Sequence, residues 1–349
     1  MRTPILVAVA ALTALTGAAS PARAQHLNPL VDLLAAKKPV FGLYAPANPR
    51  AGRGGRGGQP GTPAAAQPSA APQVVVAPPP QKSPAELARD AIVRSPNDYL
   101  FDGTMESAAN FDRSLETFSA FMAGYAAAGS PAERWKHPLV VKMHEIAPDV
   151  EKAKVSIGRQ LNTGVSSIAF VTVESADELK TGIAAMRFRS KGGTRSEDVG
   201  SAPAFWGLSE KEYKEKADVW PLNPNGELIN WTIVESKAGL DRIREIAAVP
   251  GLGVLVPGAG TLGGVFRKVD ANGQPLLDAN GRPQRDEAAW EAALQKVLDA
   301  CNEFRIPCGF PANDVATMEL RYKQGFRVFI VGWGENGFKT VEAGVALRK

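Results

Sequence analysis

Short apolar segments alternate with amphipathic helical segments along most of this chain, and this alternation constrains its fold more than any other feature. The segments that read as buried strands are 39–44, 98–102, 138–143, 166–171, 228–234, 253–256, 305–310 and 326–331. The segments with helical spacing are 111–127, 149–161, 175–186, 237–248, 287–304, 314–323 and 337–347. Strands that alternate with helices build a parallel sheet. The pattern therefore predicts an α/β protein with a closed (β/α)8 TIM barrel, and an open doubly wound sheet is the alternative.

The first 24 residues predict a secretory signal. Arg2 provides a positive start, residues 5–19 are apolar and uncharged, and Ala22-Arg23-Ala24 has the small-x-small pattern of a cleavage site. Cleavage after Ala24 makes Gln25 the first residue of the mature protein, which we expect in the periplasm or outside the cell. The apolar run is too short for a membrane anchor, so we expect no membrane span.

The charge of the chain does not favour a nucleic-acid partner. The formal net charge is +4, and removal of the signal takes away two arginines and no acid, which leaves +2. Three further arginines, Arg50, Arg53 and Arg56, lie in a low-complexity segment, so the globular part is close to neutral. Neither nucleic acid nor an anionic membrane is expected to bind it.

A low-complexity segment interrupts a single domain. Residues 48–84 consist mainly of glycine, arginine, proline, alanine and glutamine, and such a segment cannot bury enough apolar surface to offset its ordering entropy. We expect it to be a disordered insertion. Residues 25–47 before it contain helical spacing and the first predicted strand. They are therefore the start of the barrel, and residues 85–349 are the remainder.

Two irregular stretches, 187–225 and 268–285, are expected around the mouth of the barrel. The second contains two Asn-Gly turn signals. Cys301 and Cys308 are the only cysteines, and the sequence leaves open whether they form a disulfide or two buried thiols.

The stretch 258–263, Gly-Ala-Gly-Thr-Leu-Gly, matches a dinucleotide-binding pattern and follows a predicted strand. That pattern requires a helix directly after it, so that the helix N-terminus faces the pyrophosphate. The residues after 263 read as turns instead. We therefore interpret the stretch as a glycine-rich turn at a strand end, with no nucleotide cofactor.

Several segments resemble one known family, and they occur in the order of that family. The stretch 98–106 is similar to a strand that ends in Asp-x-Glu-His, residues 139–142 lie where the family has a strand ending in arginine, and 231–241 resembles the strand with a metal-binding glutamate. Residues 193–195 and 204–207 resemble its arginine loop. Residues 28–44 resemble its opening helix and first strand, 245–258 the strand after the glutamate strand, and 324–332 its last strand. Together they resemble the metal-dependent 2-oxo-acid aldolase and citrate lyase β-subunit family (HpcH/HpaI type), whose fold is a TIM barrel of the phosphoenolpyruvate/pyruvate type.

The resemblance implies a carbon–carbon lyase, an aldolase that cleaves or forms a 2-oxo acid or a hydroxyacyl substrate. In the family a divalent ion, Mg²⁺ or Mn²⁺, is held by a glutamate and an aspartate, and it stabilises the enolate of the substrate. An arginine stabilises the same charge, and a histidine moves the proton. The resemblance also implies a homo-oligomer.

The family positions are kept only in part. Glu235 matches the metal glutamate, Lys142 replaces the substrate-binding arginine, and Arg195 matches the loop cation. The expected histidine, aspartate and glutamine are replaced by Ser107, Gly260 and Ile233.

Two residues are candidates to move the proton in place of the missing histidine. His144 follows a predicted strand end, where barrel active sites form, and Glu106 precedes Ser107. Of the three histidines, His26 and His137 have no such position. The alternatives are a silenced binding protein on the same barrel, or a different lyase reaction that uses His144 or Glu106.

Overall fold

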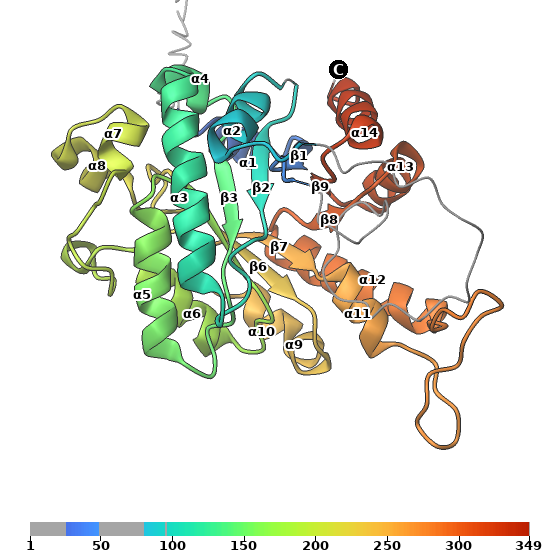
Figure 1. Cartoon of the computed structure of the whole chain (residues 1–349). Helices are drawn as coiled ribbons and strands as arrows, with labels where there is room; N and C mark the ends of the chain where they lie inside the picture. Colours follow the sequence, from blue (N-terminus) through green and yellow to red (C-terminus); the bar gives the residue numbers. More distant parts are fainter. Residues whose placement is uncertain (1–25, 49–79, 95, 349) are drawn as a thin grey trace, which may run out of the picture.

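The computed structural model describes residues 26–48, 80–94 and 96–348, and the described part of the chain forms an α/β fold around one curled parallel sheet (Figure 1). The strands are β1 (Val40–Tyr44), β2 (Tyr99–Asp102), β3 (Leu139–Lys142), β4 (Ser167–Phe170), β5 (Val219–Trp220), β6 (Leu228–Val234), β7 (Leu252–Pro257), β8 (Gly309–Pro311) and β9 (Val328–Val331). The predicted signal and almost all of the predicted insertion lie outside the described residues.

The order of the strands in the sheet largely follows the chain, and the first strand, β1, pairs with the last, β9. The order is β5-β6-β4-β3-β2-β1-β9-β8, with β7 paired to β6, and every pair of strands is parallel. One further parallel bridge joins Leu255 of β7 to Cys308, directly before β8, and the backbone N–H of Leu255 donates to Pro307 at 3.1 Å. The parallel α/β prediction is confirmed.

Helices surround the curled sheet, and most of them pack on its outer face. They are α1 (Pro29–Ala35), α2 (Pro84–Ile92), α3 (Phe111–Ala128), α4 (Pro131–Arg134), α5 (Val150–Leu161), α6 (Ala176–Met186), α7 (Ala202–Trp206), α8 (Glu210–Lys216), α9 (Lys237–Asp241), α10 (Ile243–Ala247), α11 (Ala259–Val265), α12 (Glu287–Phe304), α13 (Val315–Gln324) and α14 (Glu335–Ala346), with a 3-10 turn η1 (Arg189–Lys191). Figure 1 shows α3, α5 and α6 beside β2 and β3, and α12, α13 and α14 beside the later strands. No helix of these described residues is long and apolar enough to cross a membrane.

One apolar core lies between the sheet and the surrounding helices. The curled sheet encloses a second apolar core, here called the inner core. Its members are alternate residues of the strands together with three residues of α1: Leu30, Val31, Leu34, Val40, Tyr99, Phe101, Val140, Ala169, Val171, Trp220, Ile229, Trp231, Ile233, Val254, Val256, Val328 and Ile330. Alternation with period two turns one set of side chains inward and the other toward the helices. Gly42 leaves room for the ring of Tyr99, since a Cβ atom there would lie 2.1 Å from that ring.

Helix α1 packs against the inner core and is held at the start of β6. Glu227 is buried, and its carboxylate accepts hydrogen bonds from the backbone N–H groups of Leu27 at 3.1 Å and Asn28 at 3.0 Å. Asn28 also caps α1 and donates to the carbonyl of Glu227 at 3.0 Å. The residues that follow the predicted cleavage site are thus part of the folded domain.

The two described ends of the low-complexity segment lie side by side. The side chain of Asn48 donates to the carbonyl of Lys82 at 2.7 Å and accepts from its N–H at 2.8 Å. Ser83 then caps α2 and forms a capping box with Glu86, so this helix begins at Pro84, one residue before the predicted boundary at residue 85.

The structure corrects several element boundaries. The predicted strand 305–310 is only Gly309–Pro311, because Arg305 ends α12 in the left-handed region at φ 58° and a disulfide joins Cys301 to Cys308, with their Cα atoms 5.7 Å apart. The predicted helix 237–248 is two short helices that meet at Arg242. The glycine-rich stretch after β7 is the helix α11 and not a turn.

The two irregular stretches lie at different places. Stretch 187–225 follows α6, and its contacts are with Asn162 and Gly164, which precede β4, so it lies at the N-terminal edge of the sheet. The expectation that it surrounds the mouth is wrong, because α6 returns the chain to the opposite edge. Stretch 268–285 follows β7 and α11 and forms a projecting arm (Figure 1), and both predicted turns have glycine at positive φ, Gly273 and Gly281.

Candidate functional site

Polar side chains from several strands meet at the C-terminal edge of the sheet. Tyr44 ends β1, Lys142 ends β3, Glu235 follows β6 and Gly258 follows β7. On each strand, every second residue belongs to the inner core, and these four residues are the next in that alternation. They therefore lie on the inner face of the sheet, at its C-terminal edge. Because the strands are parallel, their C-terminal ends lie at one edge, which is where enzymes of this architecture place their sites. We call these residues, with Glu106, the strand-end cluster.

Lys142 and Glu106 form an ion pair at the centre of this cluster. The Nζ atom of Lys142 lies 3.0 Å from Oε2 of Glu106, and the lysine side chain is only 16% exposed. Burial lowers the pKa of Lys142, but the charges of Glu106, Tyr44 and Glu235 oppose it, and the net effect raises the pKa above its ordinary value of 10.5. Lys142 is therefore a permanent cation at neutral pH.

Tyr44 lies close to the same ion pair. Its ring packs edge-on against Phe101 at 5.2 Å between centroids. A Cβ atom on Gly103 would lie 3.7 Å from the Tyr44 ring and 3.8 Å from Cδ of Lys142, so both side chains lie beside Gly103. Burial raises the pKa of Tyr44, and the nearby Lys142 only partly offsets this. The phenol therefore keeps its proton.

Asp102 ends β2 beside this group. Its Oδ1 accepts hydrogen bonds from the backbone N–H and the hydroxyl of Thr104, at 2.9 and 2.6 Å. Burial raises the pKa of Asp102, and the bonds from Thr104 offset this only in part. Its bonding to Thr104 shapes the turn that leads from β2 to Glu106.

Glu235 is fixed by two neighbours. Its Oε1 accepts hydrogen bonds from the N–H of Thr172 at 3.2 Å and from its hydroxyl at 3.1 Å, and Glu235 is 6% exposed. Thr172 has a φ of 51°, a strained conformation for a β-branched residue. On the other side, a Cβ atom on Gly258 would lie 2.6 Å from Oε2 of Glu235. The carboxylate thus has one hydrogen-bonded oxygen and one packed against glycine.

His144 is not part of the strand-end cluster. Its Nδ1 lies 2.8 Å from the carbonyl of Glu145 and its Nε2 lies 2.9 Å from Oγ of Ser156 on α5. Its ring packs edge-on against Phe111 at 5.4 Å, and the residue is 3% exposed. Because both ring nitrogens already have partners, the structure gives no support to His144 as a substitute base.

Arg195 lies at the opposite edge of the sheet. Its guanidinium donates to the Asn162 side chain at 2.8 Å and to the Tyr213 hydroxyl at 3.2 Å, and it stacks over the ring of Phe188 at 4.3 Å. Asn162 precedes β4, so this arginine is far from the C-terminal ends of the strands. The expectation that Arg195 faces the substrate as a loop cation is wrong, and its contacts are those of a buried structural residue.

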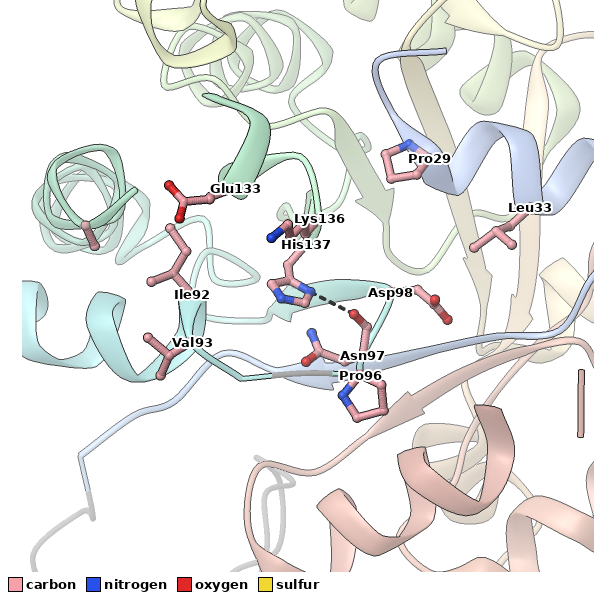
Figure 2. A pocket seen from close by; sticks show the side chains of 11 residues that line it. Pro29, Leu33, Ile92, Val93, Pro96, Asn97, Asp98, Glu133, Lys136 and His137 are labelled. Carbon is pink, nitrogen blue, oxygen red and sulfur yellow. Dashed lines mark hydrogen bonds between the residues drawn. The ribbon is translucent and has the colours of Figure 1, made fainter. Parts of the chain in front are cut away.

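The other histidines and a surface hollow also belong to the N-terminal edge. The surface hollow has a volume of about 610 Å³. Figure 2 shows side chains that line it, among them Asn97, Asp98, Lys136 and His137. His137 Nδ1 lies 2.7 Å from the carbonyl of Asn97, and Asp98 is paired with Arg348. These residues precede β2 and β3, so the hollow is separate from the strand-end cluster.

Sequence reasoning missed three residues of this region. Tyr44 and Asp102 each end a predicted strand, and Thr172 directly follows one. The position directly after a strand of a parallel barrel was the available signal. No sequence signal indicates the strained backbone of Thr172, because a positive φ at a threonine cannot be predicted from the sequence.

No family model matches this chain. The hydroxypyruvate/pyruvate aldolase of Paraburkholderia phytofirmans is 26% identical to it over 174 residues, which are 49% of this chain and 59% of that protein. The chain thus spans less than two thirds of the length of that curated relative.

Two solved structures of HpcH/HpaI proteins are similar to this chain in fold. An HpcH/HpaI aldolase/citrate lyase family protein from Burkholderia cenocepacia has a TM-score of 0.58 at 19% identity, with 92% of this chain and 95% of that chain covered. An HpcH/HpaI aldolase from Desulfitobacterium hafniense has a TM-score of 0.56 at 15% identity, with 91% and 95% covered. The resemblance to the HpcH/HpaI aldolase and citrate lyase family is confirmed. At these identities the solved structures establish the shared fold, and the activity of this chain is a proposal.

Proposed function

We propose that the protein is a carbon–carbon lyase, an aldolase that cleaves or forms a 2-oxo acid. The observation that carries the proposal is the strand-end cluster, which places the cation of Lys142 beside two carboxylates, Glu106 and Glu235. Similarity to a hydroxypyruvate/pyruvate aldolase supports the same class of reaction.

Each residue of the cluster has a role that its chemistry allows. Lys142 attracts the carboxylate and ketone oxygens of the 2-oxo acid. Glu235 accepts the proton of the substrate hydroxyl when the C–C bond breaks, because the donors that the described residues provide to its Oε1, the N–H and hydroxyl of Thr172, are neutral. Glu106 instead holds the ammonium group of Lys142 in place through their ion pair at 3.0 Å. The buried inner core lies directly beneath the cluster and keeps water away from that side of it.

A resident divalent metal does not fit the residues at this site. The family scheme uses a glutamate and an aspartate, but Gly260, at the expected aspartate position, lies within α11 and offers no side-chain oxygen. Across the described ranges, no group of three His, Cys, Asp or Glu side chains is placed to hold a metal ion. Glu235 is the single carboxylate at the expected ligand positions, and the charge of nearby Lys142 repels a cation.

A silenced binding protein is the second candidate. It is favoured by Ser107 and Gly260, which replace the histidine and aspartate of the family. On this alternative, Lys142 still captures a small carboxylate, but no bond breaks.

Three further proposals concern the whole protein. We propose that the curled sheet is a closed (β/α)8 barrel, which the bridge between Leu255 and Cys308 supports. We propose export to the periplasm or beyond, with a mature start at Gln25, which the disulfide favours because such bonds persist in oxidising compartments. We also propose a homo-oligomer, as the family resemblance implies.

Release of pyruvate from 4-hydroxy-2-oxo acids tests the lyase. We expect measurable release by the mature protein and a decrease in kcat/KM of about 10²- to 10⁴-fold in Glu235→Gln, because the amide cannot accept the proton. Glu335→Gln on the exposed first turn of α14 is the matched control and should leave the rate unchanged. Absence of release with a panel of such acids, or equal rates for Glu235→Gln and the wild type, would leave the binding protein as the better explanation.

A further inference from the structure

Lys142 supplies a positive charge at the candidate site. The ammonium group of Lys142 lies at a strand end, is largely buried, and has Glu106 at 3.0 Å as its only ion-pair partner among the described side chains. Tyr44 lies beside it, since its ring and the Lys142 side chain both flank Gly103 and the two groups interact electrostatically. The strand-end cluster thus contains two hydrogen-bond donors, an ammonium and a phenol O–H.

We propose that the site stabilises the enolate of a 2-oxo acid without a metal ion, through the ammonium of Lys142 and the phenol O–H of Tyr44. This inference rests on the proposed function and specifies how that function is performed. Preorganised donors aimed at an oxygen that gains charge are a principal source of catalysis, and a partly buried site strengthens them. Glu106 is then a positioning residue that holds the ammonium group in place.

The reaction balances without a co-reactant. When the bond between C3 and C4 of a 4-hydroxy-2-oxo acid breaks, its electron pair forms the C2–C3 double bond, and the C2 oxygen becomes an enolate beside Lys142 and Tyr44. The C4 hydroxyl loses its proton to Glu235 and becomes an aldehyde. The same proton then returns to C3, so the products are pyruvate and the aldehyde.

The alternative role for Lys142 is an imine with the substrate ketone, and the geometry disfavours it. Imine formation requires a neutral amine, and lysines that react in this way have lowered pKa values. Here the Glu106 carboxylate keeps the amine protonated, and the pKa of Lys142 is raised. An ammonium that donates to the enolate oxygen fits this environment, whereas a nucleophilic amine does not.

Oxalate binding tests the inference apart from turnover, because planar oxalate mimics the enolate of pyruvate. Isothermal titration of the mature protein should give the same Kd in EDTA as in Mg²⁺ or Mn²⁺. Lys142→Met should weaken binding about 10- to 100-fold, the range of a charge-assisted hydrogen bond, and Lys142→Arg should retain most of it. Tyr44→Phe should weaken binding about 3- to 10-fold, the range of a neutral hydrogen bond.

Lys339→Met is the matched control, because Lys339 also pairs with a glutamate at 2.8 Å but lies exposed on α14. It should leave the Kd unchanged, and circular dichroism should verify the fold of each variant. The inference is overturned if oxalate binds only with Mg²⁺ or Mn²⁺, if Lys142→Met binds like the wild type, or if borohydride with pyruvate traps an adduct on Lys142.

The outcomes separate this inference from the lyase proposal. Pyruvate release that EDTA abolishes would keep the lyase and reject the metal-free site. Metal-free oxalate binding that requires Lys142, without release from any hydroxy-oxo acid, would keep the anion site and reject the lyase.

Discussion

Gly258→Ala should disturb the candidate site through a single methyl group. A Cβ atom at this position would lie 2.4 Å from Cβ and 2.6 Å from Oε2 of Glu235, well inside van der Waals contact. The backbone itself accepts alanine, since Gly258 has a φ of −71°. The cost is therefore steric, and overpacking of this kind destabilises by about 1–3 kcal/mol. Relief requires Glu235 to move by roughly an ångström, which breaks its hydrogen bonds to Thr172.

Gly158→Ala is the matched control for this change. Gly158 lies inside α5, and a Cβ atom there would meet no other atom within 4 Å. Alanine is favoured over glycine in a helix interior, so this variant should be stabilised by about 0.5–1 kcal/mol. The same chemical substitution thus has opposite expected effects at the two positions.

Urea denaturation and oxalate titration measure the two effects. Gly258→Ala should lower the denaturation midpoint with an unchanged slope and should also weaken oxalate binding. Gly158→Ala should raise the midpoint and leave binding alone. If Gly258→Ala keeps both its stability and its affinity, Glu235 is not held where the structure places it, and the proposed role of its carboxylate has lost its geometric basis.

Four other outcomes are expected. Arg195→Met should lower the free energy of unfolding, measured by urea denaturation, by about 1.5–3 kcal/mol, because charge-assisted hydrogen bonds are lost. A weaker oxalate affinity of this variant would contradict a purely structural role for Arg195. His144→Leu should cost about 1–3 kcal/mol because Ser156 loses its partner, with kcat/KM unchanged, and an altered pH–rate profile would contradict this. Native mass spectrometry should detect no free thiol, and Cys301→Ser should destabilise by about 2.5 kcal/mol for a loop with a separation of 7 residues. Oxalate binding should persist as pH rises to 10.5, since the raised pKa of Lys142 keeps it protonated below that value, and a titration midpoint under 10.5 would oppose the assigned cation.

Much of the fold could be predicted because its signals are local. The helices α3, α5 and α12 and the strand β6 begin and end within a residue of their predicted limits, since an apolar period of 3.6 or an unbroken apolar run lies within each segment. The short helices α2, α4 and α8 were missed, although each begins with a Ser-x-x-Glu capping box after Ser83, Ser130 or Ser209. The capping box is the local sequence signal that predicts the start of each of them.

The sequence by itself determined the parallel α/β pattern, the family resemblance and the placement of Lys142 and Glu235 at strand ends, because position along a strand is a local property. Only the tertiary structure decided which of the candidates meet. Arg195 and His144 have the right chemistry, but the first follows a helix that returns to the far edge, and the second has both nitrogens hydrogen-bonded. Whether a polar side chain is free for chemistry depends on the partners that packing brings to it, and those partners come from distant parts of the chain.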